Sequence, residues 1–598
     1  MDYPIEFRRH SAAHVMAAAI KQLFPEAKFG VGPVVEHGFY YDIDIGRPVT
    51  AEDLKAIQKG MQKIVNQNPA FVREEVDIDD AIKLFDELGQ TYKLELLNDL
   101  KTKGTTKVSV EEAQDIDPQN VGSVTLYRTA EFVDLCRGPH VTEAKDIGVW
   151  KLHKVAGAYW RGKETNPQMQ RIYGLCFATK EELAEYEAMV IEAEKRDHRK
   201  LGQELELFHI DEMVGKGLVL WLPKGAAVRQ QVENLAMEME GEYGYERVVT
   251  PHIAKEELFL TSGHLPYYKD DMYPAMVMDD GTYYMKAMNC PHHHIIYRHK
   301  PRSYRELPVR LAEYGTVYRN ERSGTLAGLL RVRALAMNDA HIYCRKDQIK
   351  DEFKRVMELT MGYFKIFGLE NFWFRLSKWS PDHLDKYVNE PDNWEYSQNV
   401  LREVLIEMDV PFKEIDNEAA FYGPKVDVMF KSVIGREETM STVQLDFIAK
   451  TRFGLEYTDE KGEKNGEIFV IHRAPLSTHE RFMAFLIEHY AGAFPLWLAP
   501  VQIAVLPVAD RHVEFAQSLA KELSALGLRV SVDDSTESVG KKIRNAEKQK
   551  YPRMLVVGDR EAGGGALTVR IHGEPDQQEI SKEEFIKKSL HEIKSRTA

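Results

Sequence analysis

Two pairs of residues in the first quarter of the chain have the types and spacing needed for metal binding or proton transfer. His10 and His14 are four residues apart, so a helix would place both imidazoles on one face. Cys136 and His140 have the same separation and flank Gly138-Pro139, which indicates a turn. One thiol and three imidazoles can hold zinc tetrahedrally, or they can form a metal-free polar pocket for proton transfer. The residue types leave both alternatives open.

A second set of polar residues, in the middle of the chain, is suited to crowded anions. Tyr318-Arg319-Asn320-Glu321 opens a polar loop that returns through Leu330-Arg331-Val332-Arg333, and Glu480-Arg481 follows much later. Arginines are needed where a carboxylate meets the α-phosphate of ATP, because such a site must neutralise negative charge. A single Arg-x-Glu triplet is a weak signal. The order of the three segments supports a site for ATP-dependent carboxylate activation.

The first pairs must be positioned by a helix and a region rich in turns. Apolar residues recur at helical spacing from Phe7 to Phe24, and Pro25 ends the run. Gly and Pro residues typical of turns recur from Phe29 to about Ala178 and predict a β-rich region. The strongly charged stretch from Lys180 to about Leu205 predicts a helical connector. This shift in composition is the clearest domain boundary.

The rest of the chain divides into two parts. Residues 206–497 mix amphipathic helices with strand-like runs such as 467–472. Beyond them, predicted strands alternate with predicted helices, which favours a small domain with a mostly parallel sheet. The strands are expected at 501–508, 528–532 and 554–557, and the helices at 513–526 and 540–550.

Composition indicates an ordinary globular protein of several domains. The chain has 598 residues, of which 43% are hydrophobic and 29% are charged. No apolar run approaches the roughly 20 residues needed to cross a bilayer, and the first residues lack the pattern of a secretory signal. Four cysteines in so long a chain argue against a disulfide framework. We therefore expect a cytoplasmic protein with no membrane partner.

The charge of the chain permits a nucleic-acid partner without demonstrating one. The formal net charge is −15, but phosphate binding depends on local clusters of cations and not on the total. Such clusters lie at 195–200, 298–310 and 541–553. Each of them alone is also typical of a solvated helix face.

In combination, these motifs resemble the bacterial threonyl-tRNA synthetases, which are class II aminoacyl-tRNA synthetases, and the resemblance extends nearly from end to end. It implies an α+β multidomain fold without the small ubiquitin-like domain with which many relatives begin. The implied parts are an α+β editing domain at 1–180, a helical linker at 181–205, a class II catalytic domain with an antiparallel sheet at 206–497 and an α/β anticodon-binding domain at 498–598.

The resemblance implies that ATP, with Mg²⁺, and threonine form threonyl-adenylate, and that the threonyl group then passes to tRNA(Thr). Arg319 would bridge the carboxylate and the α-phosphate, and Glu321 would face the adenine edge. Arg481 would stack on adenine, while Arg331 or Arg333 would reach the phosphates. Class II catalytic domains usually pair, so a homodimer is implied through a segment from about Val228 to Pro251.

The resemblance also implies one zinc ion per subunit, held by Cys290, His341 and His472, which lie too far apart for spacing alone to pair them. Threonine would chelate this ion through its α-amine and β-hydroxyl, whereas valine would leave a coordination position unfilled. Further contacts to the substrate are implied for Asp339, Tyr422, Lys425 and Gln444. The three histidines after the cysteine, His292 to His294, are interpreted as surface or packing residues.

The paired motifs of the first domain resemble the editing domain of this family, which hydrolyses Ser-tRNA(Thr). A second site is needed because one methyl group supplies only about 1–3 kcal/mol of discrimination in a binding pocket. The resemblance implies a pocket that requires no bound metal. Its implied residues are His10, His14, Lys93, Tyr127, Asp134, Cys136 and His140.

The C-terminal domain resembles the anticodon-binding domain of several class II synthetases, with Arg544, Glu561 and Arg570 at positions that face anticodon bases. Four departures from the family pattern concern finer contacts: Met337, Asn338, Ala327 and the triplet 477–479. Two alternatives stay open. One is a catalytically idle paralogue that binds tRNA, and the other is a zinc hydrolase that uses only the N-terminal pairs.

Overall fold

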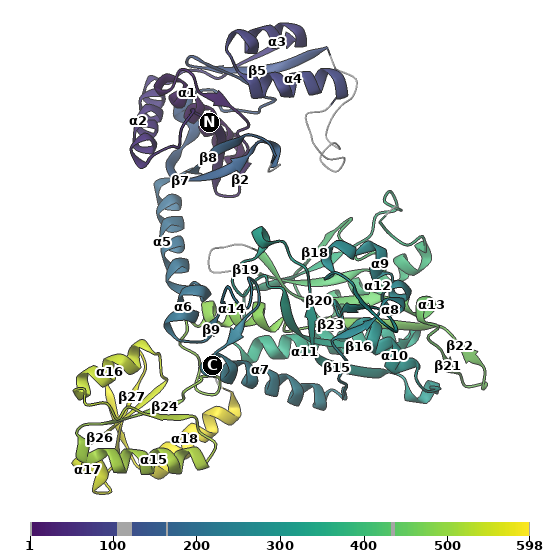
Figure 1. Cartoon of the computed structure of the whole chain (residues 1–598), viewed down its shortest axis with the longest axis vertical. Coiled ribbons are helices and arrows are strands. Elements are labelled where there is room, and N and C mark those ends of the chain that lie inside the picture. Colours follow the sequence, from purple (N-terminus) through teal and green to yellow (C-terminus); the bar gives the residue numbers. More distant parts are fainter. Residues whose placement is uncertain (1–2, 105–121, 163–164, 385, 432–436, 597–598) are drawn as a thin grey trace. The chain divides into compact units, whose positions relative to one another are not determined.

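The structure is a computed structural model that describes residues 3–104, 122–162, 165–384, 386–431 and 437–596. The chain forms two compact units, Met1–Val190 and Ile191–Ala598. Each unit combines helices with β-sheet (Figure 1). Within the described ranges, no helix has both the length and the apolar composition that a bilayer crossing requires.

The first unit is built around helix α1 (Ile5–Leu23), in which every residue from Ser11 to Ile20 is buried. The helix packs against strands β3 and β8 and against helix α2. Its many alanines allow this close approach. The strands form an antiparallel sheet of order β1-β3-β8-β7, with β2 beside β3. They are β1 (Lys28–Phe29), β2 (Val34–Val35), β3 (Gly38–Asp44), β7 (Val149–Tyr159) and β8 (Gln168–Phe177).

The expectation of a β-rich region from Phe29 to Ala178 is wrong for three segments, which form helices. They are α2 (Ala51–Gln67), α3 (Ile78–Glu87) and α4 (Thr91–Lys103). Side-chain caps explain two of them: Thr50 and Asp53 form a capping box at the start of α2, and Asp77 caps α3. Helices α3 and α4 pack against each other. Beside them lies a small antiparallel sheet of β4 (Val72–Asp77), β5 (Ser123–Thr129) and β6 (Phe132–Leu135).

The charged connector is helical, but it consists of two helices, α5 (Lys180–Arg196) and α6 (His198–Glu204). The break falls at Asp197, whose side chain accepts the backbone N–H of Arg199 at 2.8 Å and so caps α6. Aspartate is common at such positions because its carboxylate accepts hydrogen bonds from the N–H groups at the start of a helix.

The second unit contains an eight-stranded sheet of order β11-β15-β16-β23-β20-β19-β17-β18. All pairs are antiparallel except the two at the edges, β11 with β15 and β17 with β18. The strands are β11 (Glu246–Arg247), β15 (Val309–Tyr318), β16 (Ala334–Arg345), β17 (Phe372–Ser377), β18 (Phe412–Ile415), β19 (Lys425–Lys431), β20 (Glu437–Asp446) and β23 (Ile468–Ala474).

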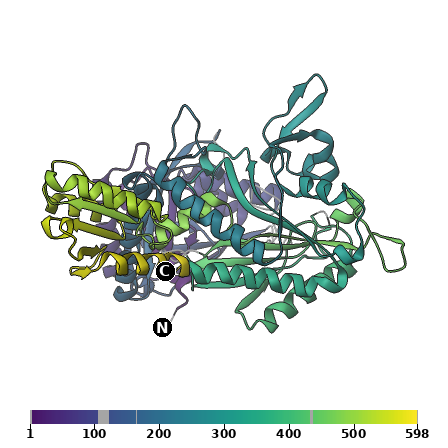
Figure 2. The same cartoon turned by 90° about the horizontal axis from the view of Figure 1, so that it is seen from below.

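Four helices share one large hydrophobic core with this sheet (Figures 1 and 2). They are α7 (Pro223–Glu242), α11 (Ile349–Ile366), α12 (Pro391–Glu407) and α14 (His479–His489). Helices α11 and α14 contact the central strand β16. The remaining elements near the site are β12 (Ile253–Lys255), α8 (Glu256–Ser262), α9 (His264–Tyr267), β13 (Met276–Met278), β14 (Gly281–Met285), α10 (Cys290–Arg298) and α13 (Ala449–Phe453).

The C-terminal region has a five-stranded sheet of order β25-β24-β26-β27-β28. Strand β24 runs parallel to β25 and β26, but β26-β27 and β27-β28 are antiparallel. The expectation of a mostly parallel sheet therefore holds for only half of the pairs, because the short connection from β26 to β27 cannot form a crossover. The elements are β24 (Ile503–Pro507), α15 (Val513–Ala525), β25 (Val530–Val532), α16 (Val539–Lys548), β26 (Arg553–Val557), α17 (Asp559–Ala562), β27 (Leu567–Ile571), β28 (Gln577–Ile580) and α18 (Lys582–Ser595).

Candidate functional site

A row of polar residues crosses the centre of the eight-stranded sheet. Strand pairing places His341 of β16 opposite His472 of β23, and His472 opposite Gln444 of β20. Gln444 in turn lies opposite Lys425 of β19. Residues that are directly opposed on neighbouring strands project from the same face of a sheet. The register therefore gathers side chains that are far apart in the sequence.

Cys290 completes a cluster with two members of this row. It begins helix α10, and ligand atoms of Cys290, His341 and His472 all lie within 4.8 Å of one another. Nε2 of His341 and Nδ1 of His472 are buried without a hydrogen bond. Burying a polar atom without a partner is costly, so these two lone pairs are suited to a cation. One thiolate and two imidazoles with an open fourth position fit a zinc site that also takes a substrate.

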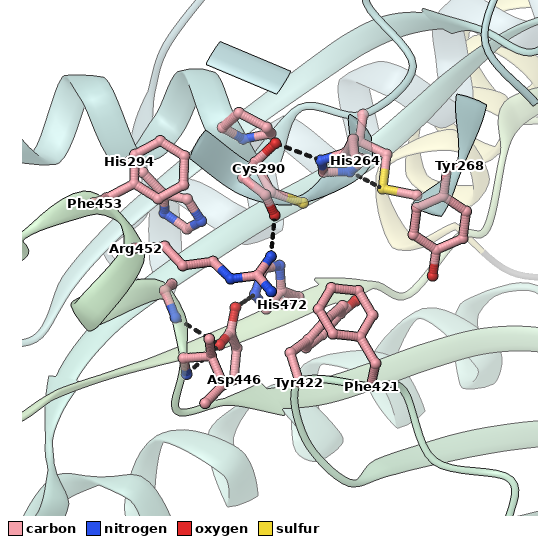
Figure 3. A pocket seen from close by; sticks show the side chains of 15 residues that line it. His264, Tyr268, Cys290, His294, Phe421, Tyr422, Asp446, Arg452, Phe453 and His472 are labelled. Atoms are coloured by element: carbon pink, nitrogen blue, oxygen red, sulfur yellow. Dashed lines mark hydrogen bonds and ion pairs between the residues drawn. The ribbon is translucent and has the colours of Figure 1, made fainter. Parts of the chain in front are cut away.

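The Asp446 carboxylate orients the His472 imidazole. Nε2 of His472 lies 3.1 Å from Oδ2 of Asp446, while Oδ1 of Asp446 accepts the N–H groups of Ile448 and Ala449 at 2.7 and 2.9 Å (Figure 3). Burial opposes charge on His472, but the Cys290 sulfur and the Asp446 carboxylate outweigh it and raise the pKa of His472. Because burial also raises the pKa of the Cys290 thiol, a bound cation would displace protons from this pair.

The second imidazole is supported by a chain that the sequence did not predict. Nδ1 of His341 lies 2.8 Å from Nδ1 of His293, and Nε2 of His293 lies 3.2 Å from Oε2 of Glu313. If His341 offers Nε2 to a cation, its Nδ1–H donates to His293, whose Nε2–H then donates to Glu313. Glu313 also accepts the N–H of Thr250 at 2.7 Å. Burial lowers the pKa of His341 well below its usual range, so this ring is neutral.

The interpretation of His292 to His294 as surface or packing residues is therefore wrong for His293. All three side chains are buried. His294 bonds the Tyr343 hydroxyl at 2.9 Å, and both ring nitrogens of His292 lack a partner. His293 differs from its two neighbours in that it hydrogen-bonds His341. The sequence, a run of three histidines, does not indicate which of them makes this contact.

One cavity is lined by members of the cluster, and a second is lined by Gln444, which lies opposite His472 in the sheet. The smaller, of about 60 Å³, is lined by Cys290, His472 and Tyr422 together with His264, Tyr268 and Arg452, which the sequence did not indicate (Figure 3). The larger, of about 400 Å³, is lined by residues that include Arg319, Glu321, Arg331, Gln444 and Arg481. The Tyr422 hydroxyl donates to Oε1 of Gln444, so one hydrogen bond joins residues of the two cavities.

The arginines of the larger cavity are held by protein groups. Nε of Arg331 donates to Oε2 of Glu321 at 2.8 Å, and Nε of Arg481 donates to the carbonyl of Leu330 at 3.3 Å. Burial lowers the pKa of Arg481. Arg333 instead donates to the Glu321 carbonyl at 2.9 Å and does not line the cavity. Of the two loop arginines, only Arg331 therefore lines the larger cavity.

The two other predicted substrate residues, Asp339 and Lys425, both lie outside the lining of the two cavities. Asp339 is buried, accepts a hydrogen bond from Nδ2 of Asn289 at 3.2 Å, and has its pKa raised by burial. Lys425 pairs with Asp427 at 3.0 Å and is not among the residues that line either cavity. Met337, one of the departures from the family pattern, lines the larger cavity.

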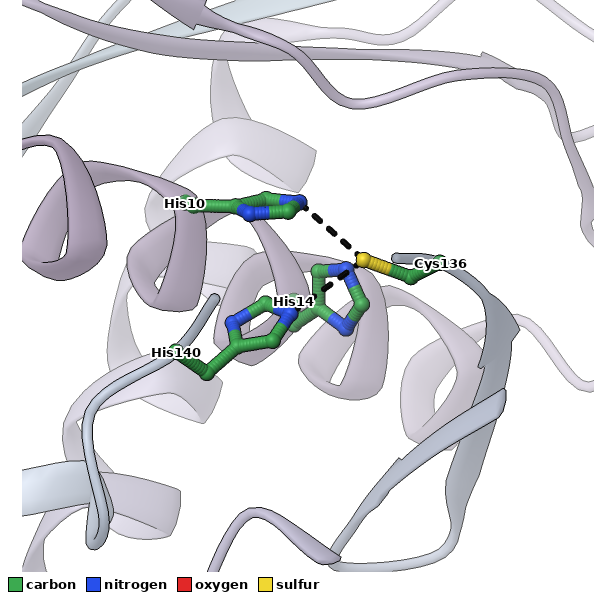
Figure 4. Close-up of side chains that lie close together, drawn as sticks. All are labelled: His10, His14, Cys136 and His140. Carbon is green, nitrogen blue, oxygen red and sulfur yellow. Dashed lines mark hydrogen bonds between the residues drawn. The ribbon is translucent and has the colours of Figure 1, made fainter. Parts of the chain in front are cut away.

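In the first unit, ligand atoms of His10, His14, Cys136 and His140 also lie within 4.8 Å of one another (Figure 4). The Cys136 sulfur lies 3.3 Å from Nε2 of His10 and 3.3 Å from Nε2 of His140. Burial raises the pKa of the Cys136 thiol to about 12 and lowers the pKa values of all three imidazoles. The cluster is therefore neutral near pH 7.

The hydrogen bonds around this cluster are compatible with one arrangement of the protons on His10, Cys136 and His140. The Pro139 carbonyl can only accept, so Nδ1 of His10 donates to it at 3.3 Å. Ser11 accepts the N–H of Val141 at 3.0 Å, and in this arrangement it donates its own proton to Nδ1 of His140, also at 3.0 Å. His140 consequently carries its proton on Nε2, and the thiol proton faces His10. The chain of hydrogen bonds closes without a cation.

A buried charge network lies behind this cluster. Nζ of Lys93 lies 2.5 Å from Oδ1 of Asp134, and Nε2 of His14 lies 3.4 Å from Oδ2 of Asp134. The hydroxyl of Tyr41, which the sequence did not indicate, donates to the same carboxylate. The ring of Tyr127 lies 4.4 Å from that of His140. The structure thus brings all seven predicted pocket residues together.

The three predicted anticodon residues belong to different elements of the C-terminal region. Arg544 is an exposed residue of α16, and Arg570 is a partly buried residue of β27. Glu561 is buried, and its carboxylate accepts hydrogen bonds from the N–H of Gly558 at 2.9 Å and the hydroxyl of Thr568 at 2.8 Å. Among the described residues, no hydrogen bond or ion pair joins these three side chains to one another.

Comparison with known families matches three parts of the chain. Residues 275–490 match the tRNA synthetase class II core domain (G, H, P, S and T), and residues 502–592 match the anticodon binding domain. Residues 124–173 match the threonyl and alanyl tRNA synthetase second additional domain. The threonine–tRNA ligase of Geobacillus sp. (strain WCH70) is 49% identical over 98% of this chain and 88% of its own length. The chain belongs to the threonine–tRNA ligase family.

Other members of the threonine–tRNA ligase family support the same assignment. Threonine–tRNA ligase 1 of Bacillus subtilis (strain 168) is 48% identical over 99% of this chain and 89% of its own length. A solved RNA binding domain of threonyl-tRNA synthetase from Cryptosporidium parvum Iowa II covers 66% of this chain and 98% of its own, with 34% identity and a TM-score of 0.63. The α+β multidomain fold with a class II core and an anticodon-binding domain is confirmed.

Proposed function

We propose that this chain is a threonine–tRNA ligase, which joins threonine and ATP as threonyl-adenylate and passes the threonyl group to tRNA(Thr). One observation carries the proposal. The Cys290–His341–His472 cluster borders a small cavity, and the arginine-lined cavity lies next to it, linked by the Tyr422–Gln444 hydrogen bond. An amino acid and ATP would therefore meet at one place.

The cluster fits zinc, and the proposed ligands are the Cys290 thiolate, Nε2 of His341 and Nδ1 of His472. A zinc ion held there would offer coordination to the α-amine and β-hydroxyl of threonine, so valine would bind less well. Asp446 and His293 keep the two imidazoles oriented. Asp339 and Tyr422 are proposed to contact the amino acid, with Lys425 and Gln444 on the same face of the sheet.

The arginines are proposed to bind ATP, which would enter with Mg²⁺ on its phosphates. Arg319 would bridge the carboxylate and the α-phosphate, Arg331 would contact the outer phosphates, and Arg481 would lie on the adenine ring. Glu321 would meet the adenine edge. In the described structure Glu321 holds Arg331 and the Leu330 carbonyl holds Arg481, so these cations are already aligned along the cavity. Prearranged charge of this kind stabilises charge that develops in the transition state.

Amino-acid-dependent ATP–pyrophosphate exchange tests this proposal. We expect exchange with threonine, weaker exchange with serine and almost none with valine. Zinc analysis should give one ion per chain, and Cys290→Ala should lose it. Cys176→Ala, which removes a buried thiol outside both clusters, is the matched control and should keep the ion. Exchange that shows no dependence on threonine would contradict the proposal and would favour an idle tRNA-binding paralogue.

We further propose that the first unit hydrolyses Ser-tRNA(Thr) without a metal. The cluster closes its hydrogen bonds through Ser11 and Pro139, and Lys93 neutralises the buried Asp134. His10 presents an unprotonated Nε2 to the thiol of Cys136, so it is the proposed base. The full chain should deacylate Ser-tRNA(Thr) in the presence of a chelator. Hydrolysis that stops with chelator and returns with zinc would contradict a metal-free pocket.

A homodimer is the proposed assembly, and exposed apolar residues support it. Between Val249 and Met278 the side chains of Val249, Ile253, Leu260, Val277 and Met278 are exposed, with Val249 at 84% and Val277 at 85%. Exposed apolar side chains that gather in one segment are a reason to propose an interface there. Sedimentation should show a dimer, and Val249→Asp should weaken it.

The tRNA partner is proposed to contact Arg544, Arg570 and Glu561. The domain boundaries are proposed at 180, 205 and 497.

A further inference from the structure

His198 lies at the start of helix α6, directly after the cap residue Asp197, and only 3% of its surface is exposed. Its imidazole contacts two segments that are remote in the sequence. Nδ1 lies 2.7 Å from Oε1 of Glu488 on α14, the helix that also carries Arg481. Nε2 lies 3.1 Å from the backbone nitrogen of Leu329. The side chain therefore bridges the connector, α14 and the loop between Arg319 and Arg333.

These contacts define the protonation of the ring. The backbone N–H of Leu329 can only donate, so Nε2 of His198 must present a lone pair. The remaining proton sits on Nδ1 and is donated to Glu488. Both nitrogens are thus used in one neutral tautomer. Few side chains can accept from a main-chain N–H and donate to a carboxylate at this separation.

Leu329 is the buried anchor of the loop that lines the larger cavity. Its side chain is fully buried in the core of the catalytic part. The next residue, Leu330, accepts the Arg481 guanidinium through its carbonyl at 3.3 Å, and Arg331 pairs with Glu321. Leu330 also closes a turn by donating its N–H to the Ala327 carbonyl at 2.9 Å. A shift at Leu329 would therefore move Arg331 and disturb the hydrogen bond that holds Arg481, two of the three arginines proposed for ATP.

Gly328 shows how closely the ring and the loop are matched. Its φ of +53° is one that side chains rarely adopt, and an added Cβ would lie 2.3 Å from Nε2 of His198. The imidazole thus occupies the space of the missing side chain. A bulkier residue at either position would force the loop away.

We propose that His198 is a positioning residue for the ATP-binding loop: it holds Leu329 in place from the connector and so sets Arg331 and Arg481. The proposal rests on the proposed function only in assigning ATP to that cavity. The contact between His198 and Leu329 supplies a loop hydrogen bond that no other described side chain makes to this N–H.

Two substitutions separate this hydrogen bond from the rest of the side chain. In His198→Asn, the carboxamide reaches the position of Nδ1 and can still donate to Glu488, but it leaves Leu329 without an acceptor. In His198→Gln, the carboxamide oxygen reaches the position of Nε2 and can accept from Leu329. We expect His198→Asn to raise the KM for ATP about tenfold, the scale of one buried hydrogen bond, with the KM for threonine within about twofold. His198→Gln should recover most of the loss.

Glu488→Gln is the matched control, because its amide oxygen still accepts from Nδ1, and it should leave the KM for ATP within about twofold. A His198→Asn enzyme with an unchanged KM for ATP would overturn the proposal. So would an equal rise in both KM values, since a change confined to the ATP-binding loop should leave the KM for threonine nearly unchanged. If the parent chain shows no threonine-dependent exchange, the proposed function fails, and equilibrium dialysis of Mg·ATP against the same variants still tests the role of His198.

Discussion

The two histidine–cysteine clusters use the same residue types at similar distances, yet their surroundings prepare them for different chemistry. In both, the potential ligand atoms lie within 4.8 Å of one another. The cluster of Cys290, His341 and His472, called the catalytic cluster after its proposed role, leaves one nitrogen of each imidazole without a partner. The other ring nitrogens are hydrogen-bonded to Asp446 and to the His293–Glu313 chain. The cluster of His10, His14, Cys136 and His140, called the editing cluster after its proposed role, instead uses the sulfur and the ring nitrogens of His10 and His140 in hydrogen bonds with one another and with Ser11 and Pro139.

The hydrogen-bond partners of the potential ligands, and not the ligand types, therefore decide whether a cluster is suited to bind a metal. A carboxylate behind an imidazole raises the basicity of the nitrogen that faces the ion. His14 alone in the editing cluster has this arrangement, with Asp134 at Nε2 and a free Nδ1, but Lys93 already neutralises that carboxylate. One free nitrogen does not make a site for zinc.

The largest expected effect is the loss of a zinc ligand. Cys290→Ala should weaken zinc binding by more than about 100-fold, beyond the 10- to 100-fold typical of losing a partner behind a ligand. Cys136→Ala, the corresponding change in the editing cluster, should leave the zinc content unchanged. Competition with a chelator measures both. Equal zinc loss in the two variants would abolish the contrast between the clusters.

The next effect concerns the chain behind His341. His293→Leu and Glu313→Gln should each weaken zinc binding about 10- to 100-fold. The first change removes the acceptor of the His341 N–H, and the second removes the carboxylate that accepts the Nε2–H of His293. His292→Gln is the neighbouring control, since neither nitrogen of His292 has a partner. The readout is again chelator competition, which does not depend on catalysis. An unchanged affinity in both variants would show that Asp446 alone supports the site.

A smaller effect is expected when the editing cluster is loosened. Ser11→Ala removes the donor to Nδ1 of His140, so this ring can move its proton to Nδ1 and present Nε2 to a metal. Zinc binding at the cluster should rise about tenfold, at the lower end of the effect of such partners. Isothermal titration of the Cys290→Ala, Ser11→Ala double variant isolates this site. If zinc binding matches that of Cys290→Ala alone, the serine has no such role.

The smallest effect is that of pH on editing. Burial lowers the pKa of His10 below its ordinary value of 6.5, so the ring is already unprotonated at neutral pH and gains a proton only in more acidic solution. Enzymatic Ser-tRNA(Thr) hydrolysis, corrected for the uncatalysed rate, should therefore change by less than about twofold between pH 6.5 and 8, since a histidine titrates mainly near its own pKa. An acidic decline centred above pH 6.5 would contradict His10 as the base.

Local spacing predicts the parts of the sites that lie on one element. The i, i+4 pair His10 and His14 follows directly from the helical period, and the charged connector follows from composition. Strand order and register are a different matter. His341 and His472 meet because β16 pairs with β23, and only the resemblance to a family indicated that pairing.

Contacts made by single buried side chains were not accessible from the sequence. Tyr41 reaches Asp134 across the first unit, and His198 reaches Glu488 and Leu329 across the catalytic part. Neither residue belongs to a motif with a defined spacing. Their roles arise from tertiary packing, which determines whether a polar side chain in the interior finds one partner or two. The helices α2 to α4 differ from the prediction for a simpler reason. Gly and Pro mark the turns between elements and do not indicate whether the element between two turns is a helix or a strand.

The in-register row from His341 to Lys425 makes the chemistry intolerant of length changes inside the strands. Because neighbouring strand residues point to opposite faces, one inserted residue in β23 before His472 would turn that imidazole away and present Ile471 or its equivalent instead. Loops can lengthen or shorten freely without this consequence. Insertions and deletions compatible with activity should therefore be confined to the connections, and a strand carrying one would mark a relative that has abandoned the reaction.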